Sequence, residues 1–250
     1  MTARGTVTAL LDRYGTTYAD EAGIRLRNTP QPLYQLLVLS NLLSARIRAS
    51  AAVAAARALF AHGLRSPDRM LAASWQERVD ALGEGGYRRY DERTATQLGD
   101  GARLLLDDYG GDLRRLREEA DGDLDALRAG LRRTPGIGPA GADIFLREVQ
   151  DVWPEAAPFV DGKALRGAEK LGLPASPAKL VRLAEGAGTT AREEHEEHER
   201  REGRAEHERC AGREGRVEQD GGRGPAALAA ALVRAALDKH VVDDVVAHAA

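Results

Sequence analysis

The chain of 250 residues has a single cysteine, Cys210, and few aromatic side chains, which make up 4% of the sequence. One thiol cannot form an intramolecular disulfide, and it cannot supply the several thiolates that hold an iron–sulfur cluster. We therefore expect no iron–sulfur cluster and no other cofactor, and a reducing cytoplasm suits such a chain. Long hydrophobic runs are also missing, because the most apolar stretch, 33–43, is broken by Gln35, Ser40 and Asn41. Neither a membrane-spanning helix nor a secretory signal is expected.

Positive charge in excess is absent as well. The whole chain carries −3 at pH 7, but residues 191–250 hold 10 Lys and Arg against 14 Asp and Glu, which leaves 26 against 25 for residues 1–190. No region therefore predicts a broad basic surface, and any binding of nucleic acid must depend on locally placed charge.

The residues that dominate the sequence favour helices. Ala, Leu, Arg and Glu are abundant, β-branched residues are scarce, and apolar residues recur at helical spacing, so the chain is predicted to be all-α. Pro32 predicts the start of a buried central helix that runs to about Ala49. Further helices are predicted over about 51–60, 67–73, 75–82, 91–109 and, with Asp123 as N-cap, 124–131.

The segment 191–224 differs from the rest in composition. Glu, Arg, His and Gly predominate in it, and Val217 is its only branched aliphatic residue. Such a segment cannot form a hydrophobic core, and we interpret it as a charged, disordered insertion.

Four potential zinc ligands lie in this segment: His195, His198, His207 and Cys210. The residues between them are mostly charged and lack the hydrophobic supports of zinc modules. We therefore favour a solvated charge run and predict no metal site.

The stretch 131–149 reads Leu-Arg-Arg-Thr-Pro-Gly-Ile-Gly-Pro-Ala-Gly-Ala-Asp-Ile-Phe-Leu-Arg-Glu-Val and predicts two helices joined by a tight turn. Pro139 suits the first position of the second helix, and Ile137 can fill the space between the helices. Gly136 and Gly138 can take positive φ, which would aim backbone N–H groups at a phosphate. The pattern is that of a helix-hairpin-helix over about 124–149, which would hold the DNA backbone without reading its sequence. A structural corner between two helices is the alternative.

With this hairpin, the chain resembles the endonuclease III superfamily of helix-hairpin-helix DNA glycosylases over about residues 31–173. The run from Tyr34 to Arg46 is similar to the family's early buried helix. Within 159–165, Phe-Val-Asp-Gly-Lys-Ala-Leu, Asp161 matches the essential aspartate that opens a helix in the family.

The resemblance implies a particular architecture. It predicts two helical lobes with an intervening cleft. The first lobe would contain residues 31–150, and the second would combine residues 1–30 with 151–250.

The resemblance also implies a reaction, which is hydrolysis of the N-glycosidic bond of a damaged base in double-stranded DNA. Asp161 would stabilise the developing positive charge or orient a water molecule after the nucleotide leaves the stack. Bifunctional relatives carry a lysine where this chain has Ala140, so a monofunctional enzyme is predicted, and Lys163 is interpreted as a surface residue. A helix N-cap is the alternative role for Asp161.

The remaining site residues follow from the same resemblance. Arg46 stands where relatives carry a glutamine that fills the gap left by the base, and Arg46 would contact DNA together with Gly136, Ile137, Gly138 and Ala140. Three aromatic residues are candidates for a base pocket, although isolated aromatics are more often core residues: Tyr87, Tyr90 and Trp153.

The resemblance therefore predicts a monomeric, cytoplasmic base-excision-repair enzyme. A non-catalytic DNA-binding protein of the same fold and a helical interaction protein are the alternatives.

Overall fold

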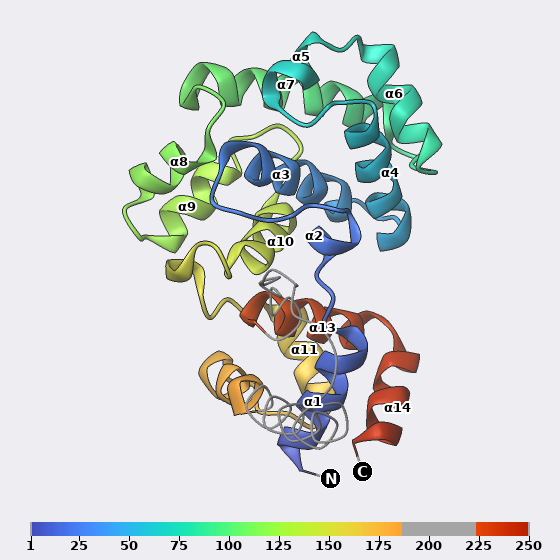
Figure 1. Cartoon of the computed structure of the whole chain (residues 1–250), viewed down its shortest axis with the longest axis vertical. Coiled ribbons are helices and arrows are strands. Elements are labelled where there is room, and N and C mark those ends of the chain that lie inside the picture. Colours follow the sequence, from blue (N-terminus) through green and yellow to red (C-terminus); the bar gives the residue numbers. More distant parts are fainter. Residues whose placement is uncertain (1, 187–223, 250) are drawn as a thin grey trace, which may run out of the picture. The chain divides into compact units, whose positions relative to one another are not determined.

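The computed structural model describes residues 2–186 and 224–249. Within these ranges every regular element is a helix and no strand occurs (Figure 1), which confirms the all-α prediction. The segment 191–224, with its His and Cys residues, lies outside the described residues except for Gly224. Among the helices described, none is long and apolar enough to cross a membrane.

The chain divides into two compact units. The larger unit is Thr17–Phe159, and the smaller unit combines Met1–Thr16 with Val160–Ala250. Residues 17–30 and 151–159, which the resemblance assigned to the second lobe, thus belong to the larger unit.

Two hydrogen bonds hold these segments within the larger unit. The backbone N–H of Ala19 donates to the Glu148 carboxylate at 2.8 Å. The indole Nε1 of Trp153 donates to the side-chain oxygen of Asn28 at 3.0 Å. Both contacts satisfy polar groups that the surrounding core would otherwise leave unpaired.

The larger unit contains nine α-helices and one short 3₁₀ helix in its described residues (Figure 1). In chain order they are α2 (Tyr18–Glu21), α3 (Pro30–Ser44), α4 (Ala49–Ala61), α5 (Pro67–Ala72), α6 (Trp75–Glu84), α7 (Asp91–Tyr109), α8 (Leu113–Ala120), α9 (Leu124–Leu131), α10 (Pro139–Val149) and η1 (Pro154–Ala156).

Helix α3 forms the centre of the larger unit. Every residue from Leu33 to Leu42 is buried, and the helix packs against α4 on one side and α10 on another. The prediction that this helix runs to Ala49 is wrong, because α3 ends at Ser44 and Ala45 is extended, with ψ of 159°. Leu43, Ala45 and Ile47 still pack against the core in partly buried positions, whereas Arg46 and Arg48 of the loop that follows α3 are exposed.

Local sequence signals set the bounds of α7 and α9 as predicted, whereas the predicted bounds of α4, α5 and α6 differ from the observed ones by one or two residues. Gly110 ends α7 with φ of +58°, a left-handed conformation that glycine adopts without a steric penalty. The Asp123 side chain caps α9 by accepting hydrogen bonds from the N–H groups of Asp125 and Ala126.

Arg78 connects three helices of the larger unit. Its side chain is buried, with 8% of the residue exposed. Nε donates to the Ala95 oxygen at 2.8 Å, and Nη1 donates to the oxygens of Met70 at 2.9 Å and Ala73 at 2.7 Å. Burial lowers the pKa of the Arg78 guanidinium. The carbonyl groups at the C-terminal end of α5 carry partial negative charge, which stabilises the cation there.

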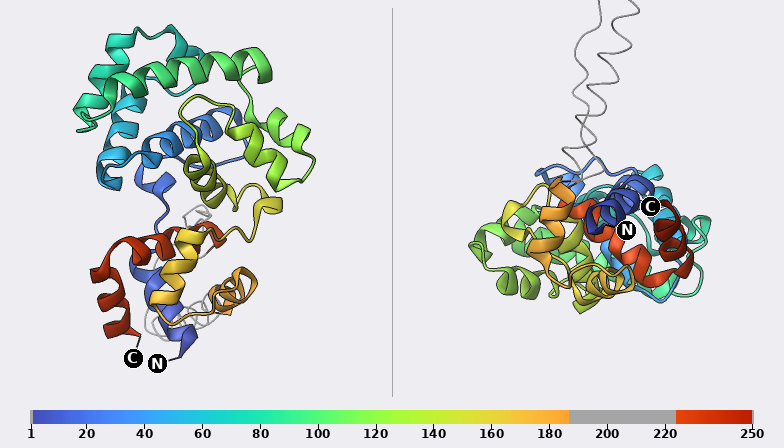
Figure 2. Two further views of the ribbon diagram at one scale, coloured as in Figure 1. Left: turned by 180° about the vertical axis from the view of Figure 1, so that it is seen from behind. Right: turned by 90° about the horizontal axis from the view of Figure 1, so that it is seen from below.

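The smaller unit is also helical in its described residues. It contains α1 (Ala3–Tyr14), α11 (Gly162–Lys170), a helical stretch at 177–186, α13 (Pro225–Leu237) and α14 (Lys239–His248). Figure 2 shows α11 crossing α13 closely. The crossing depends on Gly167, because a Cβ at this position would lie 1.9 Å from the backbone oxygen of Leu232.

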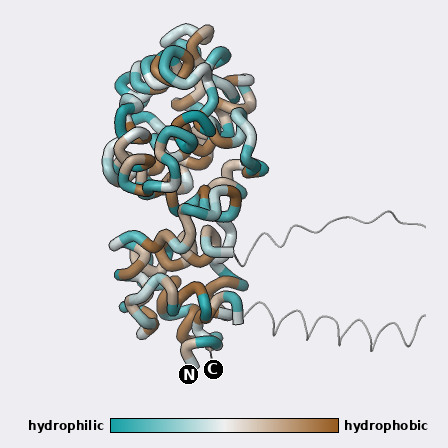
Figure 3. Tube along the Cα trace, turned by 90° about the vertical axis from the view of Figure 1, so that its left-hand side faces the viewer, coloured by the Kyte–Doolittle hydropathy of each residue, from teal (hydrophilic) through white to brown (hydrophobic). Residues whose placement is uncertain are grey.

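The first and last helices of the chain are joined by polar contacts. Arg13 forms an ion pair with Asp244, and the Tyr14 hydroxyl donates to the same carboxylate at 2.8 Å. These bonds hold the pKa of Asp244 below its usual range. In both units, hydrophobic and hydrophilic residues alternate along the helical turns (Figure 3), as expected of amphipathic helices around a core.

Candidate nucleic-acid interface

Helices α9 and α10 form the predicted helix-hairpin-helix, and both belong to the larger unit. Residues 132–138 make the turn between them. An ion pair between Arg128 on α9 and Asp143 on α10 joins the two helices. The hairpin is therefore fixed by contacts between its own helices as well as by the core beneath it.

The two glycines of the turn differ in conformation. Gly136 has φ of +87°, and a Cβ there would lie 2.1 Å from Asn41 Nδ2 and 2.9 Å from Gln97 Oε1. Gly138 has φ of −88° and ψ of −171°, and a Cβ there would meet nothing within 4 Å. The expectation of positive φ is confirmed for Gly136 and is wrong for Gly138. Gly138 is the N-cap of α10, a position that any residue with extended backbone can occupy.

Three backbone N–H groups at the start of α10 have no acceptor among the described residues: those of Gly138, Ala140 and Gly141. Pro139 has no N–H, and the first bond of the helix runs from the Ala142 N–H to the Gly138 oxygen at 3.0 Å. Gly138 is half-buried, Ala140 is exposed and Gly141 is buried, so Ala140 is the most accessible of the three. A helix N-terminus with free N–H groups and partial positive charge is suited to an anion such as a phosphate.

The turn packs against α3 and α7. Asn41 Nδ2 donates to the Pro135 oxygen at 3.3 Å, and Gly101 leaves room for the Thr134 methyl group. Ile137 is buried, with 4% exposed, and its N–H donates to the Thr134 oxygen at 3.0 Å. A small pocket of about 10 Å³ lies among residues of α3, α7 and the turn, so these parts pack closely together.

Exposed arginines lie in the loop after α3, the helix against which the turn packs, and directly before the turn itself. Arg46 and Arg48 belong to the loop between α3 and α4, which follows the turn of α3 that carries Asn41, and Arg132 directly follows α9. In the ranges the structure describes, none of these three cations has an ion-pair partner. By contrast, Arg133 is engaged with Asp108 and with the Tyr109 hydroxyl. The hairpin thus combines free N–H groups with locally placed positive charge.

Sequence reasoning missed Asn41 and Arg132. Asn41 stands out in the sequence as a polar residue within an otherwise apolar run, and such residues usually have a specific partner, but the sequence does not show that this partner is the turn. Arg132 lies directly before the turn but carries no signal beyond its charge.

The aromatic candidates for a base pocket are mainly core residues in this conformation. Trp153 is fully buried beside Phe145, with ring centroids 5.5 Å apart, and Arg117 lies over its ring. Tyr87 is also buried, and its hydroxyl accepts a hydrogen bond from Thr94 at 3.4 Å.

Tyr90 is half-buried and lies beneath the guanidinium of Arg89. Of the three candidates, only Tyr90 reaches solvent to an appreciable extent.

Asp161 belongs to the smaller unit, where it is the N-cap of α11. Its Oδ1 accepts hydrogen bonds from the N–H groups of Lys163 at 3.1 Å and Ala164 at 2.9 Å. The residue is half-buried, and so is Lys163 in the first turn of the helix. The cap role that the sequence offered as the alternative is therefore present in the structure. A catalytic role requires further that the carboxylate meet a substrate.

The described residues hold no group of three or more His, Cys, Asp or Glu side chains that could bind a metal ion. Comparison of the chain with protein-family models, with curated protein sequences and with solved structures gives no match. The argument for function thus depends on the hairpin and on the chemistry of individual residues.

Proposed function

We propose that this protein binds double-stranded DNA through the hairpin of α9 and α10. The observation that carries the proposal is the set of N–H groups of Gly138, Ala140 and Gly141, which lack acceptors in the described structure and lie at the start of a helix. A DNA phosphate would accept these bonds and gain from the partial positive charge of the helix end. Such contacts are independent of base sequence.

The arginines beside the turn support the same proposal. Phosphates of the bound duplex would be neutralised by Arg46 and Arg48, in the loop after α3, and by Arg132, directly before the turn. Because only a few phosphates would be neutralised, the logarithm of the binding constant should fall only gently with the logarithm of the salt concentration. This expectation agrees with the nearly neutral charge of residues 1–190.

We further propose that the protein is a monofunctional DNA N-glycosylase, acting as a monomer without a cofactor. In this proposal, Asp161 supplies a carboxylate that stabilises the oxocarbenium-like transition state while water attacks the sugar. The two-lobed arrangement with a cleft remains part of this proposal. Ala140 cannot act as an amine nucleophile, so the abasic product should keep an intact strand.

A non-catalytic DNA-binding protein is the second candidate. It is favoured by a specific observation, namely that Asp161 already has two backbone donors and that the helix cap alone accounts for an aspartate at this position. The burial of Tyr87 and Trp153 also leaves few exposed rings that could stack on an extruded base.

The experiment that decides between these two functions measures base release from duplex oligonucleotides that carry different damaged bases, with alkali to reveal abasic sites. The wild type should release at least one lesion, and Asp161→Asn should reduce the rate by about a hundredfold or more. DNA affinity should stay unchanged. Asp238→Asn is the matched control, because it removes the same charge from another helix N-cap of the smaller unit.

Three outcomes would contradict the catalytic proposal in different ways. Equal rates for the wild type and Asp161→Asn would reduce Asp161 to a helix cap. Efficient trapping of a protein–DNA adduct by borohydride would contradict the monofunctional assignment and point to Lys163. DNA binding without release of any lesion would favour the non-catalytic function.

A further inference from the structure

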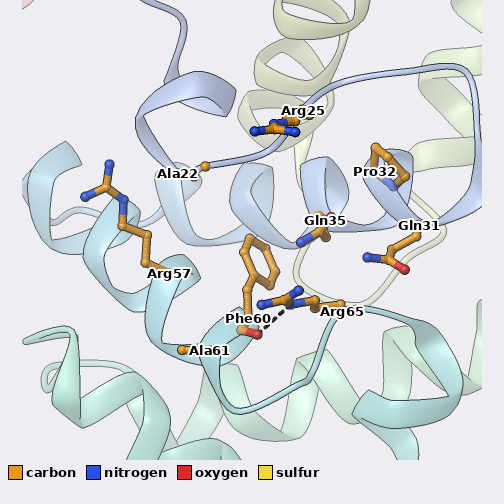
Figure 4. Close-up of a pocket in the computed structure, with 10 residues that line it drawn as sticks. Ala22, Arg25, Gln31, Pro32, Gln35, Arg57, Phe60, Ala61 and Arg65 are labelled. Carbon is orange, nitrogen blue, oxygen red and sulfur yellow. Dashed lines mark hydrogen bonds between the residues drawn. The ribbon is translucent and has the colours of Figure 1, made fainter.

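A second polar site of the larger unit lies near the N-terminal end of α3. It is a pocket of about 370 Å³ (Figure 4), within the range of small-ligand sites. The segment between α2 and α3, the first turns of α3, the last turns of α4 and the chain after α4 form its walls. Its lining residues include three arginines and two glutamines: Arg25, Arg57, Arg65, Gln31 and Gln35.

The pocket is positively charged. No carboxylate occurs among the described residues that line it. Arg65 donates from Nε to the Phe60 oxygen at 2.7 Å, which fixes the guanidinium and leaves its two terminal nitrogens available. Arg25 and Arg57 have no hydrogen bond or ion pair within the described part of the chain. All three arginines are exposed, so solvent weakens their mutual repulsion, and none of them has an ion-pair partner among the described residues to compete with a bound anion.

The amide of Gln35 adds a donor and an acceptor to the lining of the pocket. Only 8% of the residue is exposed, and its side chain has no hydrogen-bond partner among the described residues. In the view of Figure 4, this amide lies between the guanidinium groups of Arg25 and Arg65. The amide atoms are not fully enclosed and reach solvent through the pocket, so a polar ligand there would replace water as their hydrogen-bond partner.

The pocket is distinct from the hairpin. Both sites contact α3, but Gln35 lies six residues before Asn41, which supports the hairpin turn. Six residues correspond to a rise of about 9 Å and a rotation of about 240°, so the two side chains leave the helix in different directions. A phosphate held at the hairpin therefore does not extend directly into the pocket.

We infer that this pocket binds a small phosphate-bearing ligand such as a nucleotide. The phosphate groups lie among Arg25, Arg57 and Arg65, whose planar guanidinium groups match phosphate oxygens in pairs. The amides of Gln31 and Gln35 contact the organic part, because an amide offers both a donor and an acceptor. The buried side of the ligand rests against Phe60.

The test is calorimetric titration of the full-length protein with pyrophosphate and with ADP, at about 50 mM salt, where electrostatic binding is weakly screened. Saturable binding of at least one of these ligands is expected. Arg57→Gln and Arg65→Gln should each weaken it by about tenfold or more. Arg57 has no hydrogen bond or ion pair to lose among residues 2–186 and 224–249, so its variant keeps the test valid even if Arg65→Gln destabilises the fold.

The controls separate this inference from the DNA-binding proposal. Arg93→Gln removes the same charge from an exposed residue of α7 outside the pocket and should leave binding unchanged. Gly138→Asp should impair duplex binding but not ADP binding. Absence of saturable binding at about 1 mM of either ligand would overturn the inference. Equal affinities of Arg57→Gln and the wild type for the ligand would also overturn it. A loss of duplex binding in Arg57→Gln as large as in Gly138→Asp would overturn it as well, because the pocket would then be part of the DNA interface.

Discussion

Substitution of Gly138 separates the stability of the hairpin from its ability to bind phosphate. The extended backbone of Gly138 is compatible with any side chain, and a Cβ there meets no atom within 4 Å. Gly138→Asp and Gly138→Asn should therefore both fold. Each adds an N-cap acceptor and reduces the freedom of the unfolded chain, so we expect a gain in stability of about 0.5–1 kcal/mol.

The two variants should differ in DNA affinity. Aspartate puts a negative charge where we propose that a phosphate binds, whereas asparagine has the same shape without the charge. Two like charges about 4 Å apart repel by about 1 kcal/mol in bulk water and by about 4 kcal/mol at the effective dielectric of a protein surface. Gly138→Asp should thus bind duplex DNA about ten- to a hundredfold more weakly than Gly138→Asn at low salt. The difference should shrink as salt is added.

Fluorescence anisotropy with a labelled duplex measures the affinity, and circular dichroism melting measures the stability. Equal affinities and equal salt slopes for the two variants would refute the phosphate site at the start of α10.

Gly136→Ala should lower stability, in contrast to the substitutions of Gly138. It should destabilise the larger unit by about 2–3 kcal/mol, because φ of +87° strains an alanine and its Cβ would overlap Asn41.

Three further predictions concern the two cores. Arg78→Met should lower the free energy of unfolding by about 2–4 kcal/mol, because three carbonyl groups lose a charged donor, and an unchanged melting temperature would contradict this role. Gly167→Ala should destabilise the smaller unit by about 3 kcal/mol through overlap with the Leu232 oxygen, whereas Gly162→Ala, in open space on the same helix, should not. Because the folded pKa of Asp244 is depressed, its contribution to stability is present above its unfolded pKa and lost as pH falls through the lower folded value. The stability difference between the wild type and Asp244→Asn should accordingly be present near neutral pH and vanish in strong acid, and a difference that persists there would contradict the assignment.

Much of the helical fold could be predicted because its signals are local. The N-cap at Asp123 and the left-handed Gly110 each act within one turn of the chain, and both lie where the sequence placed them. The early end of α3 could not be predicted in this way. Whether the chain remains helical after Leu42 depends on which neighbours cover it, and that information comes from distant segments.

The conformations of the two hairpin glycines also depend on distant parts of the chain. Its motif predicted the turn and the free N–H groups but assigned one conformation to two glycines. Gly136 must avoid Asn41 and Gln97, which lie far from it in sequence, whereas Gly138 faces open space. The requirement for glycine at position 136 is therefore tertiary, and the pattern Gly-Ile-Gly does not distinguish the two positions.

Asp161 cannot be assigned from the sequence for a different reason. A helix cap needs an oxygen that accepts hydrogen bonds, whereas a glycosylase needs a negative charge near the sugar. An aspartate directly before a helix meets both needs. The structure establishes the first role through the bonds to Lys163 and Ala164. Asparagine retains the acceptor and lacks the charge, so Asp161→Asn removes the charge that the reaction requires and keeps the cap. A folded variant with normal DNA affinity and no base release would therefore assign the charge to catalysis, since the cap would still be intact.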